Sequence, residues 1–274
     1  MPRIRTTASP STELHYCDLG SGQPVVLIHA WPLSHRMWES QIIALCDGGY
    51  RCIAYDRRGF GESGRPSGGY DYDTFTSDLN DLMTQLDVRD AVLVGYSMGG
   101  GEVARYIGRY GAGRVAKAAL VASVTPFLLK TGDNPGGVDR AVFDGMIEGA
   151  KADRVGFLEQ FFPAFYNHEP GKGVSADLIP FSKWMAWNAS PLATVDCITA
   201  FGTTDFRGDL QKMTMPTLVA HGDSDQVVPF EISGKLAHEQ IKGSRLEVIK
   251  GAPHGLAATH STQVSELLLD FLGS

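Results

Sequence analysis

The chain has 274 residues, of which 43% are hydrophobic and 20% charged, a composition typical of a globular protein that can bury a sizeable core. Its formal net charge is −7 and no basic block stands out, which argues against nucleic-acid binding. No apolar run is long enough to span a membrane and the N-terminus lacks a signal-peptide pattern, so we expect a cytoplasmic protein with no membrane partner.

Apolar runs rich in β-branched residues alternate with helical patterns along the chain. This alternation predicts an α/β fold with a mostly parallel sheet. The expected strands lie near residues 14–18, 24–29, 51–55, 91–95, 115–122, 217–221 and 245–249. The expected helices lie near residues 36–45, 74–86, 99–110, 231–238 and 262–272.

A long segment, residues 123–209, separates the fifth expected strand from the sixth. A structureless loop of that length is uncommon inside a compact domain. We therefore predict a helical cap inserted into a core formed by residues 1–122 and 210–274. Most aromatic residues of the cap should pack its own core, but some should line a substrate pocket, because ligand sites are concave and largely apolar. For that lining we choose Phe127, Phe162, Trp184 and Trp187.

The sequence Gly95-Tyr96-Ser97-Met98-Gly99 lies between an expected strand and an expected helix. This is the G-x-S-x-G pattern in the strand–turn–helix setting that a nucleophilic serine requires. The sharp turn predicts a positive φ for Ser97, and glycines on either side let neighbouring backbones pass closely. A plain turn between a strand and a helix is the alternative interpretation.

A serine nucleophile needs a base, and the base needs a carboxylate that orients it. Two loops that follow expected strands offer these groups: one contains Asp223 and Asp225, and the other contains His254. We choose His254 as the base and Asp225 as its partner, although spacing alone does not exclude Asp223. A neutral imidazole is required, so we expect activity to fall below about pH 6 to 6.5, the ordinary histidine range.

An oxyanion hole needs two preorganised backbone N–H donors. The residue after the nucleophile, Met98, supplies one. For the second we choose Trp31, in the loop after the strand at 24–29, where Pro32 has no N–H to compete. The side chain of Trp31 either packs in the core or forms a wall of the substrate pocket, and we include it in the pocket lining.

Several stretches together resemble one family. They are HAWPL at 29–33, YDRRGFGES at 55–63, GYSMGGGE at 95–102, HGDSDQVVP at 221–229 and GAPHG at 251–255. The chain resembles the cofactor-free (non-haem) haloperoxidase, perhydrolase and aryl-esterase family of α/β-hydrolases over nearly its whole length. The resemblance implies a mostly parallel eight-stranded sheet, a triad of Ser97, Asp225 and His254, and an oxyanion hole of the Trp31 and Met98 amides. It also favours Asp225 over Asp223.

The resemblance implies a hydrolase of small esters, with lactams or amides as further substrates. It also implies formation of peracids from a carboxylic acid and hydrogen peroxide, the peracid then oxidising halide in solution. We expect no cofactor and no metal, since neither a haem nor a metal ligand pattern is present and the four cysteines lack C-x-x-C spacing. A C–C bond hydrolase and a hydrolase-like ligand-binding protein remain alternatives, and homo-oligomer formation stays open.

One departure from the family pattern is Ala30, where the family usually has glycine. A methyl group there would shift the oxyanion loop or narrow the acyl side of the pocket. The sequence Asp56-Arg57-Arg58 also matches the family. We interpret it as structural, a turn that braces the nucleophile turn from below.

Overall fold

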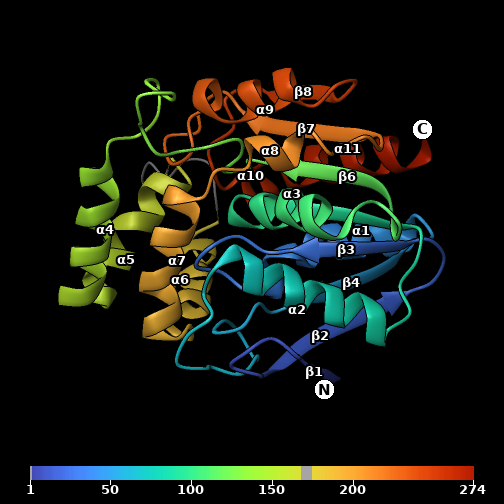
Figure 1. Cartoon of the computed structure of the whole chain (residues 1–274), viewed down its shortest axis with the longest axis horizontal. Coiled ribbons are helices and arrows are strands. Elements are labelled where there is room, and N and C mark those ends of the chain that lie inside the picture. The colour runs from blue at the N-terminus through green and yellow to red at the C-terminus, as the bar shows by residue number, and fades with distance from the viewer. Residues whose placement is uncertain (1, 168–174) are drawn as a thin grey trace.

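The computed structural model describes residues 2–167 and 175–274, and its centre is a single eight-stranded sheet with the strand order β1-β2-β4-β3-β5-β6-β7-β8 (Figure 1). Strand β2 runs antiparallel to β1 and β4, and the remaining neighbours are parallel. The mostly parallel eight-stranded sheet is therefore confirmed. The strands are β1 (Arg3–Arg5), β2 (Glu13–Gly20), β3 (Pro24–Ile28), β4 (Arg51–Tyr55), β5 (Ala91–Tyr96), β6 (Val115–Val121), β7 (Thr217–Gly222) and β8 (Arg245–Ile249).

Outside the long insertion every predicted helix is present, and one short helix, α10 (Leu256–Thr259), was not predicted. Two of the predicted helices each begin with a short 3-10 turn, and β1 was missed because three residues show no periodicity. The 3-10 turns are η1 (His35–Trp38) and η2 (Phe230–Ile232). The α-helices are α1 (Glu39–Asp47), α2 (Tyr72–Gln85), α3 (Met98–Tyr110), α4 (Arg140–Ala152), α5 (Arg154–Phe165), α6 (Leu178–Trp187), α7 (Pro191–Thr203), α8 (Arg207–Leu210), α9 (Gly234–Gln240), α10 (Leu256–Thr259) and α11 (Ser261–Gly273).

Helices cover both faces of the sheet. Successive side chains of a strand point to opposite faces, so both sets are buried. Along β5, Leu93 packs into the cluster that includes α2 and α3, whereas Val92 and Val94 pack into the cluster that includes α1 and α11. Strands buried on both sides are apolar throughout, which is why β3 and β5 were recognisable as uninterrupted apolar runs.

Helices α4 to α7 follow β6 and gather beyond the carboxyl ends of the parallel strands (Figure 1). Helix α4 packs against α5 and α7, and α5 packs against α6. We call these four helices and the segments between them the helical insertion. Its division from the core as a separate cap stays a prediction. Residues 168–174, between α5 and α6, lie outside the described residues. None of the helices in the described part of the chain combines the length and apolar character needed to cross a membrane.

Candidate active site

Ser97 lies at the sharp turn between β5 and α3, with φ 53° and ψ −116°. The predicted positive φ is confirmed. A Cβ atom on Gly95 would lie 2.3 Å from the carbonyl oxygen of Gly99, and one on Gly99 would lie 2.4 Å from that of Ile28. Only glycine permits these approaches, so the turn brings the start of α3 against the end of β3 and holds Ser97 at the edge of the sheet.

Two hydrogen bonds join the three residues chosen from the sequence. The Nε2 atom of His254 lies 2.9 Å from Oγ of Ser97, and its Nδ1 atom lies 2.6 Å from Oδ2 of Asp225. An ionised carboxylate can only accept, so Nδ1 of His254 is the donor to Asp225 and Nε2 is free to accept the hydroxyl proton of Ser97. The loops that follow β7 and β8 thus bring an acid and a base to the serine at the end of β5.

The carboxylate of Asp225 is held in place by its own loop. Its Oδ1 atom accepts N–H bonds from Val227 at 2.9 Å and Val228 at 2.8 Å. Its Oδ2 atom, shared with His254, lies 3.2 Å from Nε2 of His221. Burial by itself raises the pKa of this carboxyl, but the imidazoles of His254 and His221 lower it further than burial raises it, to below its usual range. Asp225 therefore stays ionised at neutral pH.

Asp223 points elsewhere. Its Oδ1 atom accepts the backbone N–H of Gly251 at 2.6 Å and the hydroxyl of Ser224 at 3.1 Å, and the residue is exposed. The side chain therefore ties two loops together at the surface. The hydrogen bonds thus distinguish Asp225, which contacts His254, from Asp223, which does not; spacing alone had left both open.

Two aromatic rings, those of Tyr96 and Phe165, pack against His254. The hydroxyl of Tyr96 donates to the carbonyl oxygen of His254, and the ring of Phe165 meets the imidazole edge-on at 4.9 Å between centroids. The N–H of Gly255 donates to the carbonyl of Phe165 at 2.7 Å. Helix α5 of the insertion is thereby bonded directly to the loop that carries His254.

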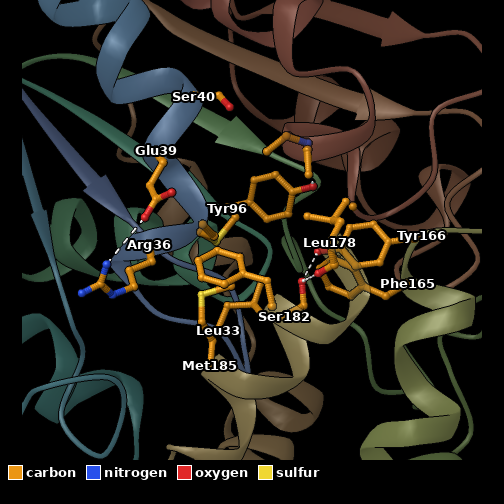
Figure 2. A pocket seen from close by; sticks show the side chains of 15 residues that line it. Leu33, Arg36, Glu39, Ser40, Tyr96, Phe165, Tyr166, Leu178, Ser182 and Met185 are labelled. Atoms are coloured by element: carbon orange, nitrogen blue, oxygen red, sulfur yellow. Dashed lines mark hydrogen bonds and ion pairs between the residues drawn. The ribbon is translucent and has the colours of Figure 1, made fainter. Parts of the chain in front are cut away.

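A cavity of about 190 Å³ lies behind these rings, and Figure 2 shows its lining. Tyr96 and Phe165 belong to its wall, and the Tyr166 hydroxyl bonds Oγ of Ser182 at 2.7 Å. Neither Ser97 nor His254 lines it, so this larger space is separate from the reacting groups.

A smaller cavity, about 70 Å³, contains Ser97 and His254. We call it the reaction cavity. Apart from those two residues its wall is apolar, and it comes from the sheet edge, the insertion and the loop after β7: Trp31, Val124, Leu128, Val138, Val142, Phe143, Met146, Phe161, Phe201, Val227 and Val228. Of the five pocket residues predicted from the sequence, the cavity includes Trp31.

The other four predicted lining residues lie outside the reaction cavity. Phe127 packs under the guanidinium of Arg207, and Phe162 is wholly buried among aromatic rings of α5. Trp184 and Trp187 lie on the outer face of α6, with 49% and 40% of their surface exposed. None of the four lines the reaction cavity, and their contact with substrate stays a prediction; they were chosen for aromatic character, without knowledge of how the insertion packs.

The residues that sequence reasoning missed share a recognisable pattern. On α4, Met146 follows Val142 by four residues and Phe143 by three, so each of these two lies beside it on the helix surface, and all three line the cavity. An apolar stripe at this spacing could have been found in the sequence. Its partner surfaces, Phe201 on α7 and Val227 after β7, depend on tertiary packing and carry no such signal.

Ala30 is fully buried and packs in the cluster that contains Leu33 and Trp38. It does not line the reaction cavity, so the extra methyl group does not narrow that space. The expectation that Ala30 restricts the acyl side is thus wrong for the cavity wall, because the residue faces the sheet core.

The two amides chosen for the oxyanion hole come from neighbouring segments. Met98 is the first residue of α3, where a helix leaves its N–H groups without an intrahelical acceptor. Trp31 follows β3, and its indole Nε1–H donates to the carbonyl of Thr194 at 3.1 Å. Within residues 2–167 and 175–274, the backbone N–H groups of Trp31 and Met98 donate to no protein acceptor. Both remain available to a ligand oxygen.

One buried group within the described residues has the composition of a metal site: His15, His35 and Asp56, with donor atoms within 4.8 Å of one another. Asp56 already accepts the backbone N–H groups of His35 and Glu62, each at 2.8 Å, and faces both imidazoles at 2.8 and 3.3 Å. Its oxygens are therefore engaged by protein donors, and the group braces the turn that begins at Asp56.

Comparison with known proteins shows relatives over nearly the whole chain. The family described as "alpha/beta hydrolase fold" matches residues 23–261. A non-heme chloroperoxidase of Kitasatospora aureofaciens is 43% identical over 97% of this chain and 98% of its own length. A bifunctional esterase/perhydrolase of Acinetobacter calcoaceticus is 38% identical, with 98% and 99% of the two chains covered. The crystal structure of a bromoperoxidase from Bacillus anthracis superimposes with a TM-score of 0.94 and 49% identity, covering both chains completely.

An eight-stranded α/β sheet with a serine on a strained turn defines the class of protein. The chain belongs to the α/β-hydrolase family, in the group of non-haem haloperoxidases and related esterases. The family expected from the sequence is confirmed.

Proposed function

We propose that this enzyme hydrolyses small esters through a covalent acyl-enzyme formed on Ser97. One observation supports this most directly. An unbroken chain of two hydrogen bonds runs from the ionised Asp225 through His254 to the Ser97 hydroxyl, which lines an apolar cavity. A serine in this arrangement is activated for attack on a carbonyl carbon.

In the acylation step, Ser97 attacks the ester carbonyl while Nε2 of His254 removes the hydroxyl proton. Asp225 holds the imidazole and stabilises its charge once protonated. The N–H groups of Trp31 and Met98 stabilise the oxyanion. His254 then protonates the departing alkoxide, which leaves as an alcohol. Water, deprotonated by His254, attacks the acyl-enzyme and releases the carboxylic acid and Ser97. Amides and lactams would react by the same steps.

The reaction cavity favours small, uncharged acyl groups. Its volume of about 70 Å³ is roughly half of the ~150 Å³ apolar cavity that holds one benzene molecule. Apart from Ser97 and His254, its described lining has no polar or charged side chain, and burying an unpaired charge in such a place is costly. We therefore propose esters of short acyl chains as substrates, with an aryl group only in the departing alcohol.

Peroxide could replace water in deacylation, as the name of the Acinetobacter relative suggests by analogy. Hydrogen peroxide attacks the acyl-enzyme, His254 takes its proton, and the products are a peracid and free Ser97. The peracid then oxidises halide in solution, which accounts for a haloperoxidase activity without a halide site. The acyl-enzyme is the shared intermediate, so we propose both activities for the same serine.

Labelling with a fluorophosphonate probe tests the proposal and separates it from a ligand-binding role. We expect the wild type to be labelled at Ser97 and the Ser97→Ala variant to lose labelling, aryl-ester hydrolysis and peracid formation together. Ester hydrolysis at a near wild-type rate in Ser97→Ala would refute the mechanism. A folded wild-type protein that is never labelled and never turns over an ester would point to ligand binding.

A further inference from the structure

The peptide group between Ala30 and Trp31 carries one of the two proposed oxyanion donors. Its carbonyl oxygen lies 2.8 Å from Nδ1 of His29 and also accepts the N–H of Leu33 at 3.0 Å. In a planar trans peptide the C=O and N–H bonds point to opposite sides. Whatever fixes the carbonyl of Ala30 therefore fixes the direction of the Trp31 N–H.

His29 can donate to that carbonyl only in one tautomer. The backbone N–H of Arg57 donates to Nε2 of His29 at 3.0 Å, so Nε2 is an acceptor and the proton lies on Nδ1. The side chain is completely buried, and burial together with the nearby Arg57 guanidinium lowers the pKa of His29 to about 3. At neutral pH the ring is uncharged and points its single N–H at Ala30.

The same arginine ties the His29 segment to the helix that carries the other donor. Its Nη2 atom donates to the carbonyl of His29 at 3.1 Å, and its Nε atom donates to Oε2 of Glu102 at 2.8 Å. Glu102 lies on α3, the helix that begins at Met98. The proposed structural role of the 56–58 turn thus extends to a link between the two segments that carry the oxyanion amides.

We propose that His29 is a positioning residue that orients the Trp31 N–H toward the developing oxyanion. The inference rests on the proposed function, because it needs a tetrahedral intermediate at Ser97. His29 lies outside the reaction cavity, so its effect passes through the Ala30–Trp31 peptide. A reversed imidazole, with its proton on Nε2, would remove this donor from the carbonyl of Ala30 and leave it held by the N–H of Leu33 alone, so the peptide could rotate.

Substitution of His29 by Asn and by Gln provides a matched pair. The Asn amide nitrogen lies near the position of Nδ1 and can still donate to Ala30, whereas Gln places its amide near Nε2 and leaves the carbonyl without this donor. Complete loss of an oxyanion donor lowers kcat by roughly 10²–10³-fold. Because His29→Gln should only misorient the donor, we expect kcat for a small aryl ester to fall about 10–100-fold with KM changed less than about 3-fold, and His29→Asn to recover most of that loss.

A boronic acid, which forms a tetrahedral adduct on the serine, supplies a second readout. Its affinity should fall in proportion to kcat/KM across the variants, whereas a neutral, non-covalent competitive inhibitor should bind unchanged. Equal kcat values for His29→Asn and His29→Gln, or an unchanged boronate affinity in a folded His29→Gln, would overturn the inference. Ser97→Ala, measured alongside, distinguishes failure of the proposed function from failure of this inference. An active Ser97→Ala would refute the proposed function. An inactive Ser97→Ala together with His29 variants that behave as wild type would refute only the role of His29.

The wild-type protein gives a test that does not depend on variants that fold. In ¹⁵N-resolved NMR spectra of the histidine rings, His29 should be the neutral Nδ1–H tautomer from pH 8 to pH 5. A slowly exchanging Nδ1 proton should be visible throughout that range. The Nε2–H tautomer anywhere in that range would contradict the proposal directly, because Nδ1 would then have no proton to donate to Ala30.

Discussion

The two halves of the reaction cavity are held by different forces. The half at the strand ends contains Ser97, Asp225 and His254, positioned by hydrogen bonds of defined direction and by one residue with positive φ. The half from the helical insertion presents Val142, Phe143 and other apolar side chains, positioned by packing alone. In the proposed mechanism, directed bonds define which reaction occurs, whereas packing defines which acyl group fits. The two halves should therefore be separable by substitution.

The largest effect is expected in the strand-end half, from Asp225→Asn. The amide would favour the wrong tautomer of His254, so kcat should fall by about 10⁴-fold with KM little changed. Asp223→Asn, two residues from Asp225, is the matched control. The new amide keeps an oxygen that accepts the N–H of Gly251. Steady-state hydrolysis of one aryl ester measures both. An equal loss in the two variants would contradict the assignment of Asp225.

Phe143→Leu should change the insertion half without touching the reaction. The smaller side chain enlarges the reaction cavity, and one methylene in an apolar pocket is worth about 10-fold or more in discrimination. We expect the preference in kcat/KM to move about 10-fold toward longer acyl chains, with the fluorophosphonate labelling rate within about 3-fold of wild type. Competition between acetyl, butyryl and hexanoyl esters measures the shift.

Phe162→Leu is the control for that substitution. The same change is made in a ring that is equally buried on the insertion but does not reach the cavity. It should lower the free energy of unfolding by about 1 kcal/mol or more while leaving the order of preferred acyl chains as in wild type. A shift in preference equal to that of Phe143→Leu would mean that packing anywhere in the insertion, rather than the wall itself, selects the substrate.

Lowering the pH should decrease the free energy of unfolding through His29, which lies next to the strand-end half of the cavity. Its pKa in the folded protein is about 3, below the ordinary histidine value near 6.5, so between these limits the unfolded chain binds the extra proton. Stability is therefore greatest above about pH 6.5 and falls as the pH drops toward 3, by at most about 1.4 kcal/mol per pH unit from this residue.

Urea unfolding of wild type and His29→Gln at several pH values measures how the free energy of unfolding changes with pH. The wild-type curve should be the steeper of the two between pH 6.5 and 4. Below the ordinary aspartate range, Asp225 adds a second loss, because its lowered pKa in the folded protein means that only the unfolded chain takes up a proton there. Parallel curves for the two proteins between pH 6.5 and 4 would contradict the assignment of a neutral, buried His29.

The smallest effect is expected from Trp187→Ala. The side chain is 40% exposed on α6 and lies outside the reaction cavity. We expect kcat/KM for small esters to stay within about 2-fold of wild type and the free energy of unfolding to change by less than about 1 kcal/mol. A marked change in acyl preference would place this tryptophan at the substrate after all.

Features encoded in contiguous residues could be predicted from the sequence. The positive φ of Ser97 follows from a strand, a tight turn and a helix within a dozen residues, and the alternation of apolar runs is sufficient for the parallel sheet. His254 and Asp225 could be predicted as partners of Ser97 because parallel strands end at one edge of the sheet. Residues just after β7 and β8 must therefore lie near the end of β5.

Spacing left both Asp223 and Asp225 open, and the family resemblance favoured Asp225. The tertiary structure supplies the physical reason, because the two carboxylates bond to different partners. It also decided which apolar residues of the insertion line the reaction cavity, because that depends on how helices from distant segments pack rather than on residue type. The same reason explains His29: its neighbours in sequence reveal nothing of a bond from Arg57, which reaches it only because β3 and β4 pair in register. Local backbone geometry is encoded in short stretches, whereas contacts between elements require the assembled fold.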